Sequence, residues 1–297
     1  MGVFENKVAI VTGAGDGIGR AEALVLAAAG AAVVVNDVES SVADSVAAEI
    51  VESGGRAVAG CGDVADWKVT AGLVAQALDS FGRLDVVVAN AGIVRRSPVV
   101  AVTEEDLDDQ VGVLFKGTFG LIRHAAAHWE REFGAGNRAH RTIVATSSSA
   151  GVPGGVQEFS VYGAMKSGIA ALTLGAALEF RRFGVTVNAI LPHAATRMDA
   201  FAKGLPSPGQ FPVGDASPDS PFHVADVVSY LASARASWLS GQVFEITGTE
   251  VRRWLPWSPG VSVSSSAGPW TGEALDQAMA TAVYGTLPGG RVIPLSR

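Results

Sequence analysis

One stretch near the start of the chain decides its fold: Val8-Ala9-Ile10-Val11-Thr12-Gly13-Ala14-Gly15-Asp16-Gly17-Ile18-Gly19. A short apolar run is followed by a turn with glycine at every second position, and then by residues of helical period. Glycines let the backbone turn sharply and approach a pyrophosphate, whose charge is stabilised at the N-terminus of the next helix. The stretch predicts a strand, a turn and a helix that bind a dinucleotide.

Within this turn, the residues expected at the phosphates are Gly13, Asp16, Gly17, Ile18 and Gly19. A glycine-rich turn can also be mere punctuation between a strand and a helix. The strand–turn–helix context favours the binding role.

Asp37 ends the second apolar run, 24 residues (37 minus 13) beyond Gly13. A carboxylate about 20 residues past the turn accepts hydrogen bonds from the adenosine ribose. Together with Asp16 it would repel a 2′-phosphate, and Arg20 is the only basic residue nearby in the sequence. NAD is therefore expected as cofactor in preference to NADP. The alternative role for Asp37 is an N-cap for the helix that begins near Ser41.

Short apolar runs alternate with stretches of helical period along most of the chain. The runs are rich in Val and Ile and do not alternate with polar residues, as in strands buried on both faces of a parallel sheet. The runs cover residues 8–12, 32–36, 57–61, 84–89, 142–146, 185–191 and 242–246, and the helical stretches cover 17–29, 41–53, 66–80, 104–133, 160–182 and 223–234. This order predicts an α/β fold, a doubly wound seven-stranded parallel sheet (a Rossmann fold), with residues 1–248 as one domain.

Two regions depart from this alternation. Residues 193–222 are rich in Pro and Gly, and a loop of that length in a compact domain is typical of a substrate lid. Residues 249–297 include Trp254, Trp257 and Trp270 and a helical stretch at 272–281, and we interpret them as a C-terminal extension. Large aromatic residues in an extension are usually anchors, either on their own subunit or over the cleft or a neighbouring subunit.

Composition excludes several classes of protein. The chain has 297 residues, 48% hydrophobic and 17% charged, which argues against disorder. A net charge of −7 argues against nucleic-acid and anionic-membrane partners, and no metal site is predicted. Cys61 is the only cysteine, and residues 1–6 have no signal-peptide pattern, so a cytoplasmic protein is expected.

Tyr162 and Lys166 stand one helical turn apart in Tyr162-Gly163-Ala164-Met165-Lys166. A free tyrosine, with a pKa of about 10, is a poor base at neutral pH. A cation close by stabilises the phenolate and lowers that pKa toward a range useful for proton transfer. The pair is therefore a candidate for acid–base chemistry, although the same spacing also occurs in exposed helix pairs.

In these motifs the sequence resembles the short-chain dehydrogenase/reductase family over residues 7–248. The resemblance implies that Tyr162 and Lys166 are catalytic and also contact the cofactor. It assigns Asp63 and Val64 to the adenine, and Asn90-Ala91-Gly92 to a turn beside the cofactor. It also implies a small-molecule substrate, and a homodimer or homotetramer formed through the long helices.

The family requires a serine that binds the reacting oxygen, and the chain offers Ser147, Ser148 and Ser149. The strand pattern selects Ser148, whereas the family spacing of thirteen residues before Tyr162 selects Ser149. We favour Ser148, because a loop tolerates an inserted residue better than a strand end does.

The residues Asn36-Asp37, 116–119 and 192–198 are most similar to one branch of the family, which includes the 3-hydroxyacyl-CoA dehydrogenase units of peroxisomal multifunctional enzymes and related bacterial dehydrogenases. That similarity places Pro192 and Thr196 near the nicotinamide. His193 stands where the family commonly has Gly, and it could either contact substrate or cap a helix.

The expected function is reversible hydride transfer between NAD and a secondary alcohol or ketone, with a hydroxyacyl thioester or a steroid-like substrate. One departure supports an alternative. Leu114 stands where many family members have an Asn that holds a water next to the lysine, so the chain could be a catalytically weak NAD-binding regulatory or scaffold protein. A nucleotide-sugar epimerase is disfavoured, because the region after residue 193 is too short for a sugar-binding domain.

Overall fold

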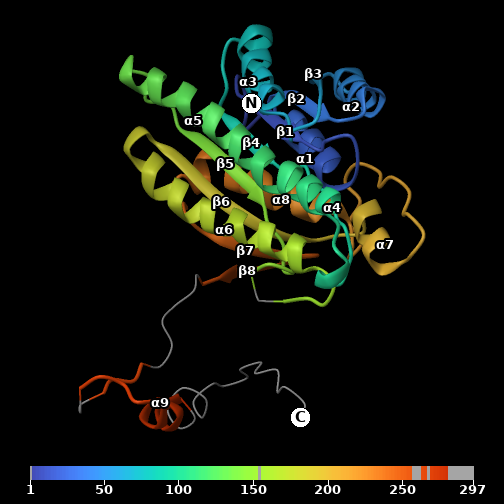
Figure 1. The fold of residues 1–297 in the computed structure, drawn as a ribbon. Helices are drawn as coiled ribbons and strands as arrows, with labels where there is room; N and C mark the ends of the chain where they lie inside the picture. The colour runs from blue at the N-terminus through green and yellow to red at the C-terminus, as the bar shows by residue number, and fades with distance from the viewer. Residues whose placement is uncertain (1, 153–154, 256–261, 266–267, 280–297) are drawn as a thin grey trace. The chain divides into compact units, whose positions relative to one another are not determined.

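The computed structural model describes residues 2–152, 155–255, 262–265 and 268–279. The chain forms two compact units, Met1–Trp254 and Leu255–Arg297. In the first unit, helices cover both faces of one sheet (Figure 1). Its strands are β1 Val8–Thr12, β2 Ala32–Asp37, β3 Arg56–Cys61, β4 Val86–Ala89, β5 Arg141–Thr146, β6 Val185–His193, β7 Val243–Thr247 and β8 Glu250–Trp254. Its α-helices are α1 Gly17–Ala28, α2 Ser40–Glu52, α3 Trp67–Phe81, α4 Glu104–Gln110, α5 Thr118–Gly134, α6 Ser160–Phe180, α7 Arg197–Lys203 and α8 Pro221–Ala232.

The strand order across the sheet is β3-β2-β1-β4-β5-β6-β7-β8, and every pairing from β3 to β7 is parallel. The order reverses direction between β1 and β4. In open α/β sheets such a switch point opens a crevice at the carboxyl ends of the strands, where ligands bind. The doubly wound α/β fold predicted from the sequence is confirmed, and it fixes the edge of the sheet at which a site forms.

The core lies on both faces of this sheet. Alternate residues of β1 enter different clusters: Ala9 and Val11 pack with α1, α2 and α8, and Val8 and Ile10 pack with α3, α5 and α6. All five residues of β1 are buried. A strand covered by helices on both sides must be apolar at every position, which explains the continuous apolar runs in the sequence.

The sheet has one strand more than the seven expected. β8 pairs antiparallel with β7, and Gly248, with φ +53°, lies in the two-residue turn between them. The expectation that nothing after residue 248 completes the sheet was therefore wrong. β8, Glu-Val-Arg-Arg-Trp, is an edge strand with exposed side chains, so it has no apolar run to reveal it.

The helical stretch 104–133 is divided in the structure. A π-helix, Val111–Gly117, joins α4 to α5, and Leu114 lies within it. π-helical segments are frequent at functional sites. The segment 193–222, in which no element was expected, contains α7, and the hydroxyl of Thr196 caps that helix by accepting from the Asp199 amide at 3.0 Å.

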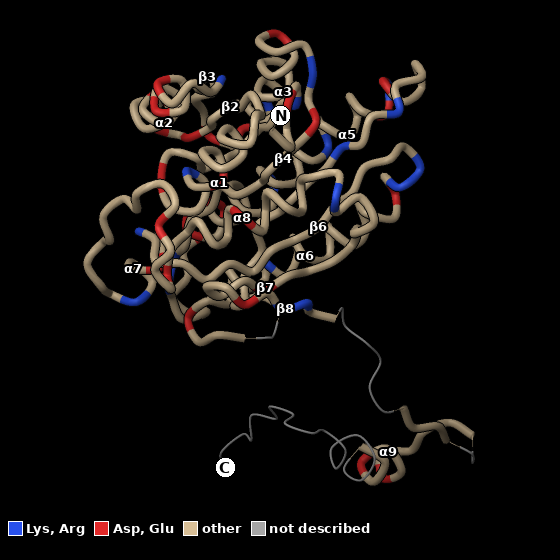
Figure 2. The backbone as a smooth tube through the Cα atoms, turned by 180° about the vertical axis from the view of Figure 1, so that it is seen from behind, with Lys and Arg blue, Asp and Glu red and all other residues tan. Residues whose placement is uncertain are grey.

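The aromatic residues of the expected extension differ in their structural context. Trp254 lies in β8 and Trp270 is 41% exposed, whereas Trp257 is outside the described residues. α9, Gly272–Ala278, lies in the second unit, where a helix was expected. Among the described residues, Ser160–Phe183 has a length and mean hydropathy that would also suit a membrane span, and α6 within it packs on β5 and β6. Along the backbone seen from behind, Lys and Arg are interspersed with Asp and Glu (Figure 2).

Candidate active site

The glycine turn lies between the end of β1 and the start of α1, as predicted. Gly17 has φ +55°, a conformation that favours glycine, and a Cβ at Gly19 would lie 2.1 Å from the carbonyl oxygen of Gly13. Asp16 caps α1, its carboxylate accepting from the Gly17 amide at 2.8 Å. Ile18 packs against the core cluster on that face of the sheet. The turn thus brings the N-terminus of α1 to the crevice.

Asp37 lies at the end of β2 and binds the glycine turn through its carboxylate. Its Oδ2 accepts from the Gly15 amide at 3.0 Å, and its Oδ1 accepts from the Glu39 amide at 3.3 Å. It is not the N-cap of α2, since that position belongs to Glu39. The capping alternative for Asp37 was therefore wrong, and its carboxylate lies beside the glycine turn.

Arg20 is not available to bind a phosphate. It is buried, and its guanidinium contacts the carboxylate of Glu49 and donates to the Phe211 carbonyl at 3.2 Å. A cation that the sequence did not indicate lies beside the turn: Nε of Arg197 pairs with the Asp16 carboxylate at 3.6 Å.

Asp63 and Val64 follow β3. Asp63 accepts from the Ala65 amide at 2.8 Å, and Val64 is buried. A Cβ at Gly117, the last residue of the π-helix, would lie 2.8 Å from Val64 Cγ2, so these two segments are in close contact.

Asn90, directly after β4, ties that strand end to the glycine turn. Its side-chain amide donates to the carbonyls of Thr12 and Gly13 at 3.1 and 3.3 Å. The hydroxyl of Thr12 in turn accepts from the amides of Asn90 and Ala91, both at 3.1 Å. The Asn90-Ala91-Gly92 turn therefore holds the two strands at the switch point together.

Lys166 lies on α6 and is almost fully buried, with 3% exposure. Its Nζ donates to the Thr146 carbonyl at 2.6 Å, and burial lowers the pKa of Lys166 to about 7. Ser147 is buried and donates to the Lys166 carbonyl at 2.6 Å, so its hydroxyl fixes α6 to β5. Thr146 and Ser147 are supporting residues that the motif spacing did not reveal.

Tyr162 lies one turn before Lys166, with its ring centroid 5.7 Å from Nζ. Burial raises the pKa of Tyr162 above its usual value, and a hydrogen bond with Ser148 lowers it in part. The sequence pattern predicted a lowered pKa, whereas the net direction in the structure is upward because desolvation is the larger effect. Of the serine run, Ser148 is the residue that contacts the tyrosine.

Leu114 is fully buried. A Cβ at Gly92 would lie 3.3 Å from Leu114 Cδ2 and 3.7 Å from Lys166 Nζ, so Leu114 and the lysine border the same small space. An apolar side chain there cannot hydrogen-bond a water, as the sequence indicated.

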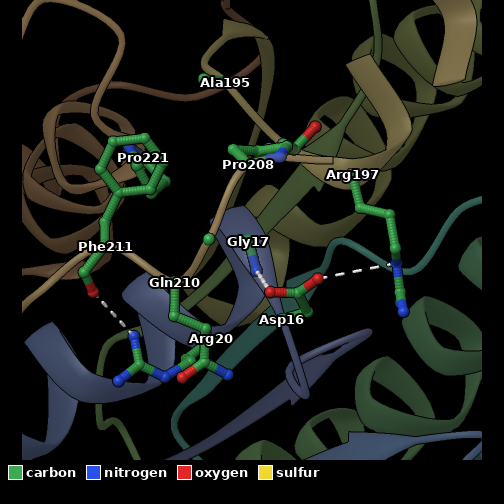
Figure 3. Close-up of a pocket in the computed structure, with 11 residues that line it drawn as sticks. Asp16, Gly17, Arg20, Ala195, Arg197, Pro208, Gln210, Phe211 and Pro221 are labelled. Atoms are coloured by element: carbon green, nitrogen blue, oxygen red, sulfur yellow. Dashed lines mark hydrogen bonds and ion pairs between the residues drawn. The ribbon is translucent and has the colours of Figure 1, made fainter. Parts of the chain in front are cut away.

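The loop after β6 closes one side of the crevice. A small pocket lies between the start of α1 and this loop, and its lining includes Thr196 and Phe211. In Figure 3, Arg197 is directed at Asp16, and Arg20 at the Phe211 carbonyl. Pro192, half-buried near the end of β6, lies opposite Ile246 in the register.

This edge of the sheet fits a dinucleotide. The amides at the start of α1 can donate to a pyrophosphate, and the Asp37 carboxylate can accept from a ribose hydroxyl. The absence of a side chain at Gly92 keeps space open in front of Lys166.

Comparison with known proteins agrees with this geometry. Residues 7–203 match the family model of the short chain dehydrogenases. The hydroxyacyl-CoA dehydrogenase ChsB1 of Mycobacterium tuberculosis is 42% identical over 255 residues, which cover 84% of this chain and 79% of that protein. The resemblance to the hydroxyacyl-CoA dehydrogenase branch is confirmed.

Two solved structures are similar over most of their length. A short chain dehydrogenase from Mycobacterium avium is 41% identical, with a TM-score of 0.87 over 97% of this chain and 98% of the other. A 7α-hydroxysteroid dehydrogenase, in complex with NADH and 7-oxo glycochenodeoxycholic acid, is 27% identical, with a TM-score of 0.71 over 83% of this chain and 94% of the other. The chain therefore belongs to the short-chain dehydrogenase family and is an oxidoreductase that acts on CH–OH groups.

Proposed function

We propose that the protein is an NAD-dependent dehydrogenase that interconverts a secondary alcohol and a ketone, with a hydroxyacyl thioester as its main substrate class. The observation that carries the proposal is the grouping of Ser148, Tyr162 and Lys166 beside the glycine turn, at the carboxyl edge of the sheet. These three residues supply a hydrogen-bond donor, an acid–base group and a cation in one cluster, in which Lys166 is buried.

Each residue of the cluster has a distinct task in this proposal. The hydroxyl of Ser148 orients the reacting oxygen, and Tyr162 takes the alcohol proton during oxidation and returns it during reduction. Lys166 stabilises the ionised tyrosine by its charge and binds the nicotinamide ribose. Bound NAD supplies the acceptor for the hydride that leaves the carbinol carbon.

The preference for NAD over NADP rests on charge around the adenosine ribose. Asp37 ends β2 beside the glycine turn and is proposed as the ribose-binding carboxylate, whereas Arg20 is engaged by Glu49 and by the Phe211 carbonyl. A 2′-phosphate would meet an anion without a free cation from α1 to offset it. The 7α-hydroxysteroid dehydrogenase neighbour was solved with NADH.

In this proposal the other residues predicted from the sequence also contact the cofactor. Gly13, Gly17 and Gly19 surround the pyrophosphate with Asp16 and Ile18 beside them. Asp63 and Val64 contact the adenine. Asn90, Ala91 and Gly92 border the nicotinamide half, together with Pro192 and Thr196.

The substrate class is supported by the relatives. The relative from Mycobacterium tuberculosis is named as a hydroxyacyl-CoA dehydrogenase, and the 7α-hydroxysteroid dehydrogenase acts on a large ring system. We propose residues 193–222 as the substrate lid and the residues after β8 as an extension. A homodimer or homotetramer in the cytoplasm completes the proposal.

The second candidate is a catalytically weak NAD-binding regulatory or scaffold protein. Leu114 is the observation that favours it, because its buried side chain removes one route for a proton to the lysine. The backbone carbonyl of Thr146, 2.6 Å from Lys166 Nζ, offers a polar partner in its place.

One experiment separates the two candidates. NADH formation is followed with a panel of 3-hydroxyacyl thioesters and hydroxysteroids, and NAD binding is titrated on the same protein. A dehydrogenase turns over at least one member of the panel at a kcat of about 1 s⁻¹ or more. Tight NAD binding without turnover on any member would favour the regulatory role.

A further inference from the structure

His193 was singled out in the sequence, and the catalytic cluster does not use it. It ends β6, two residues after Leu191, which packs in a cluster with Ala170 of α6 and Val243 of β7. Residues two apart on a strand share a face. His193 therefore lies on the face of the sheet covered by α6, the helix that carries Tyr162.

The strand order puts His193 at the same edge of the sheet as the serine run. Thr146 pairs with Ile190, and the Ser147 amide donates to the Ile190 carbonyl at 2.8 Å. β5 and β6 are neighbouring parallel strands, so Ser148, which follows β5, and His193, which ends β6, lie at the same carboxyl edge of the sheet. His193 therefore lies at the edge that carries the candidate reaction site.

The capping role left open by the sequence does not apply to His193, since Thr196 caps α7. The imidazole instead contacts Glu245 of β7, with Nε2 3.1 Å from Oε1. That carboxylate is 13% exposed, whereas the His193 side chain is 41% exposed. The ring is thus held from within the sheet and is open on its other side.

β8 completes this arrangement. The second oxygen of Glu245 accepts from Arg252 at 3.1 Å and from the indole of Trp254 at 3.0 Å. Both donors belong to β8, the eighth strand, which was not predicted from the sequence. A carboxylate fixed by two further donors holds the ring in one orientation, as a carboxylate does for the histidine of a catalytic triad.

We propose that His193 is a specificity-determining residue that binds the thioester carbonyl of the substrate while Tyr162 and Ser148 hold the hydroxyl two carbons along. This assignment rests on the proposed function and deepens it. With Nε2 bonded to Glu245, the nitrogen left for the substrate is Nδ1. When the ring is protonated both nitrogens carry a hydrogen, and with Nε2–H on Glu245 the Nδ1–H is then the donor for a carbonyl oxygen.

The test compares two substrates of equal chain length: a 3-hydroxyacyl thioester and a secondary alcohol without the carbonyl. We expect His193→Ala to lower kcat/KM for the thioester by about 10–100-fold, the range for one hydrogen bond to a charged group. The simple alcohol should change by less than about threefold, because it has no oxygen to bind. Glu245→Gln should show the same selectivity with a smaller loss.

Arg253→Ala is the matched control, since Arg253 lies on β8 opposite Phe244 and its side chain is exposed. It should leave both substrates unchanged, and the melting temperature of each variant verifies that it folds. An equal loss on both substrates, or no loss on the thioester, overturns the assignment of His193 and leaves the proposed function standing. A wild-type protein that oxidises only the simple alcohol overturns both the thioester substrate class and the role of His193.

Discussion

Lys166 is buried beside Tyr162, the residue proposed to transfer the proton. Burial lowers its pKa to about 7, so both protonation states are accessible at neutral pH. An ionised Tyr162 beside it favours the ammonium form, and the ammonium form in turn stabilises the phenolate. Activity should therefore depend on the protonation states of both groups.

Ser148 is the serine whose hydroxyl hydrogen-bonds Tyr162. We expect Ser148→Ala to reduce kcat by about 10²–10³-fold, as for loss of one donor to a reacting oxygen. Ser149→Ala is the matched control and should change kcat by less than about threefold. Steady-state kinetics of both variants with the same substrate check this. A loss confined to Ser149→Ala would transfer the role to that residue.

Asp37 should set the preference for NAD. We expect NAD to bind at least about tenfold more tightly than NADP, because the carboxylate binds a ribose hydroxyl and repels a phosphate. Asp37→Ala should narrow that ratio, whereas Asp44→Ala, at an exposed position on α2, should not. Fluorescence titration with NAD and with NADP measures the ratio of the two affinities. Equal binding of NADP by the wild type would contradict the assignment.

At the residue scale, local spacing was informative where contacts are local. Tyr162 and Lys166 could be paired from their separation, since one helical turn sets their geometry. Arg197 could not be placed near Asp16, because that contact depends on the path of a long loop. The sequence also left two candidates for the serine, because the strand pattern selects Ser148 and the spacing before Tyr162 selects Ser149. The contact with Tyr162 in the structure favours Ser148.

At the scale of elements, the strands of the parallel sheet were predictable because burial on both faces demands continuous apolar runs. β8 and α7 were not predicted from the sequence, for different reasons. β8 is an exposed edge strand, and α7 is a short helix of seven residues that begins in a Pro- and Gly-rich segment. The π-helix was not predicted either, since its residues keep a helical period.

Asp85 joins two elements at the opposite edge of the sheet from the active site. It is 2% exposed, precedes β4, and accepts from Lys7 at 3.0 Å, from the Val8 amide at 3.1 Å and from Arg83 at 2.7 Å. Burial alone would raise the pKa of Asp85, but the hydrogen bonds from Arg83 and Lys7 bring it below its usual value. The carboxylate therefore stabilises the fold only while it is ionised.

We expect Asp85→Asn to lower the free energy of unfolding by about 2–4 kcal/mol at pH 7. Because the folded-state pKa is lowered, this contribution is present above about pH 4 and is lost as the pH falls through the lowered value. Urea unfolding at several pH values measures it, with the exposed Asp44→Asn as control. A difference between wild type and Asp85→Asn that stays constant down to the most acidic pH would contradict the assignment.

At the scale of the whole molecule, the first compact unit ends with β8 at Trp254. A chain truncated after Trp254 should keep its melting temperature and its NAD affinity, because sheet and core remain complete. A chain truncated after Thr249 should melt about 4 °C lower or more, since it loses β8 and two partners of Glu245. Scanning calorimetry compares the two.

The two truncations also test the residues after β8. The chain that ends at Trp254 lacks these residues. Its mass in solution shows whether they contribute to assembly, and its substrate KM shows whether they contribute to substrate binding. Both roles were predicted from the aromatic residues in the sequence. Equal stability of both truncated chains would contradict the place given to β8 in the sheet.

The most direct test of the central claim is the activity of Tyr162→Phe, measured as NADH formation from a hydroxyacyl thioester alongside a titration of NAD. Only the hydroxyl that transfers the proton is removed, so kcat should fall by about 10²–10⁴-fold while NAD affinity stays near that of the wild type. Tyr230→Phe, on α8 and exposed, is the matched control and should be fully active. A Tyr162→Phe enzyme that keeps more than about a tenth of wild-type activity would contradict the account.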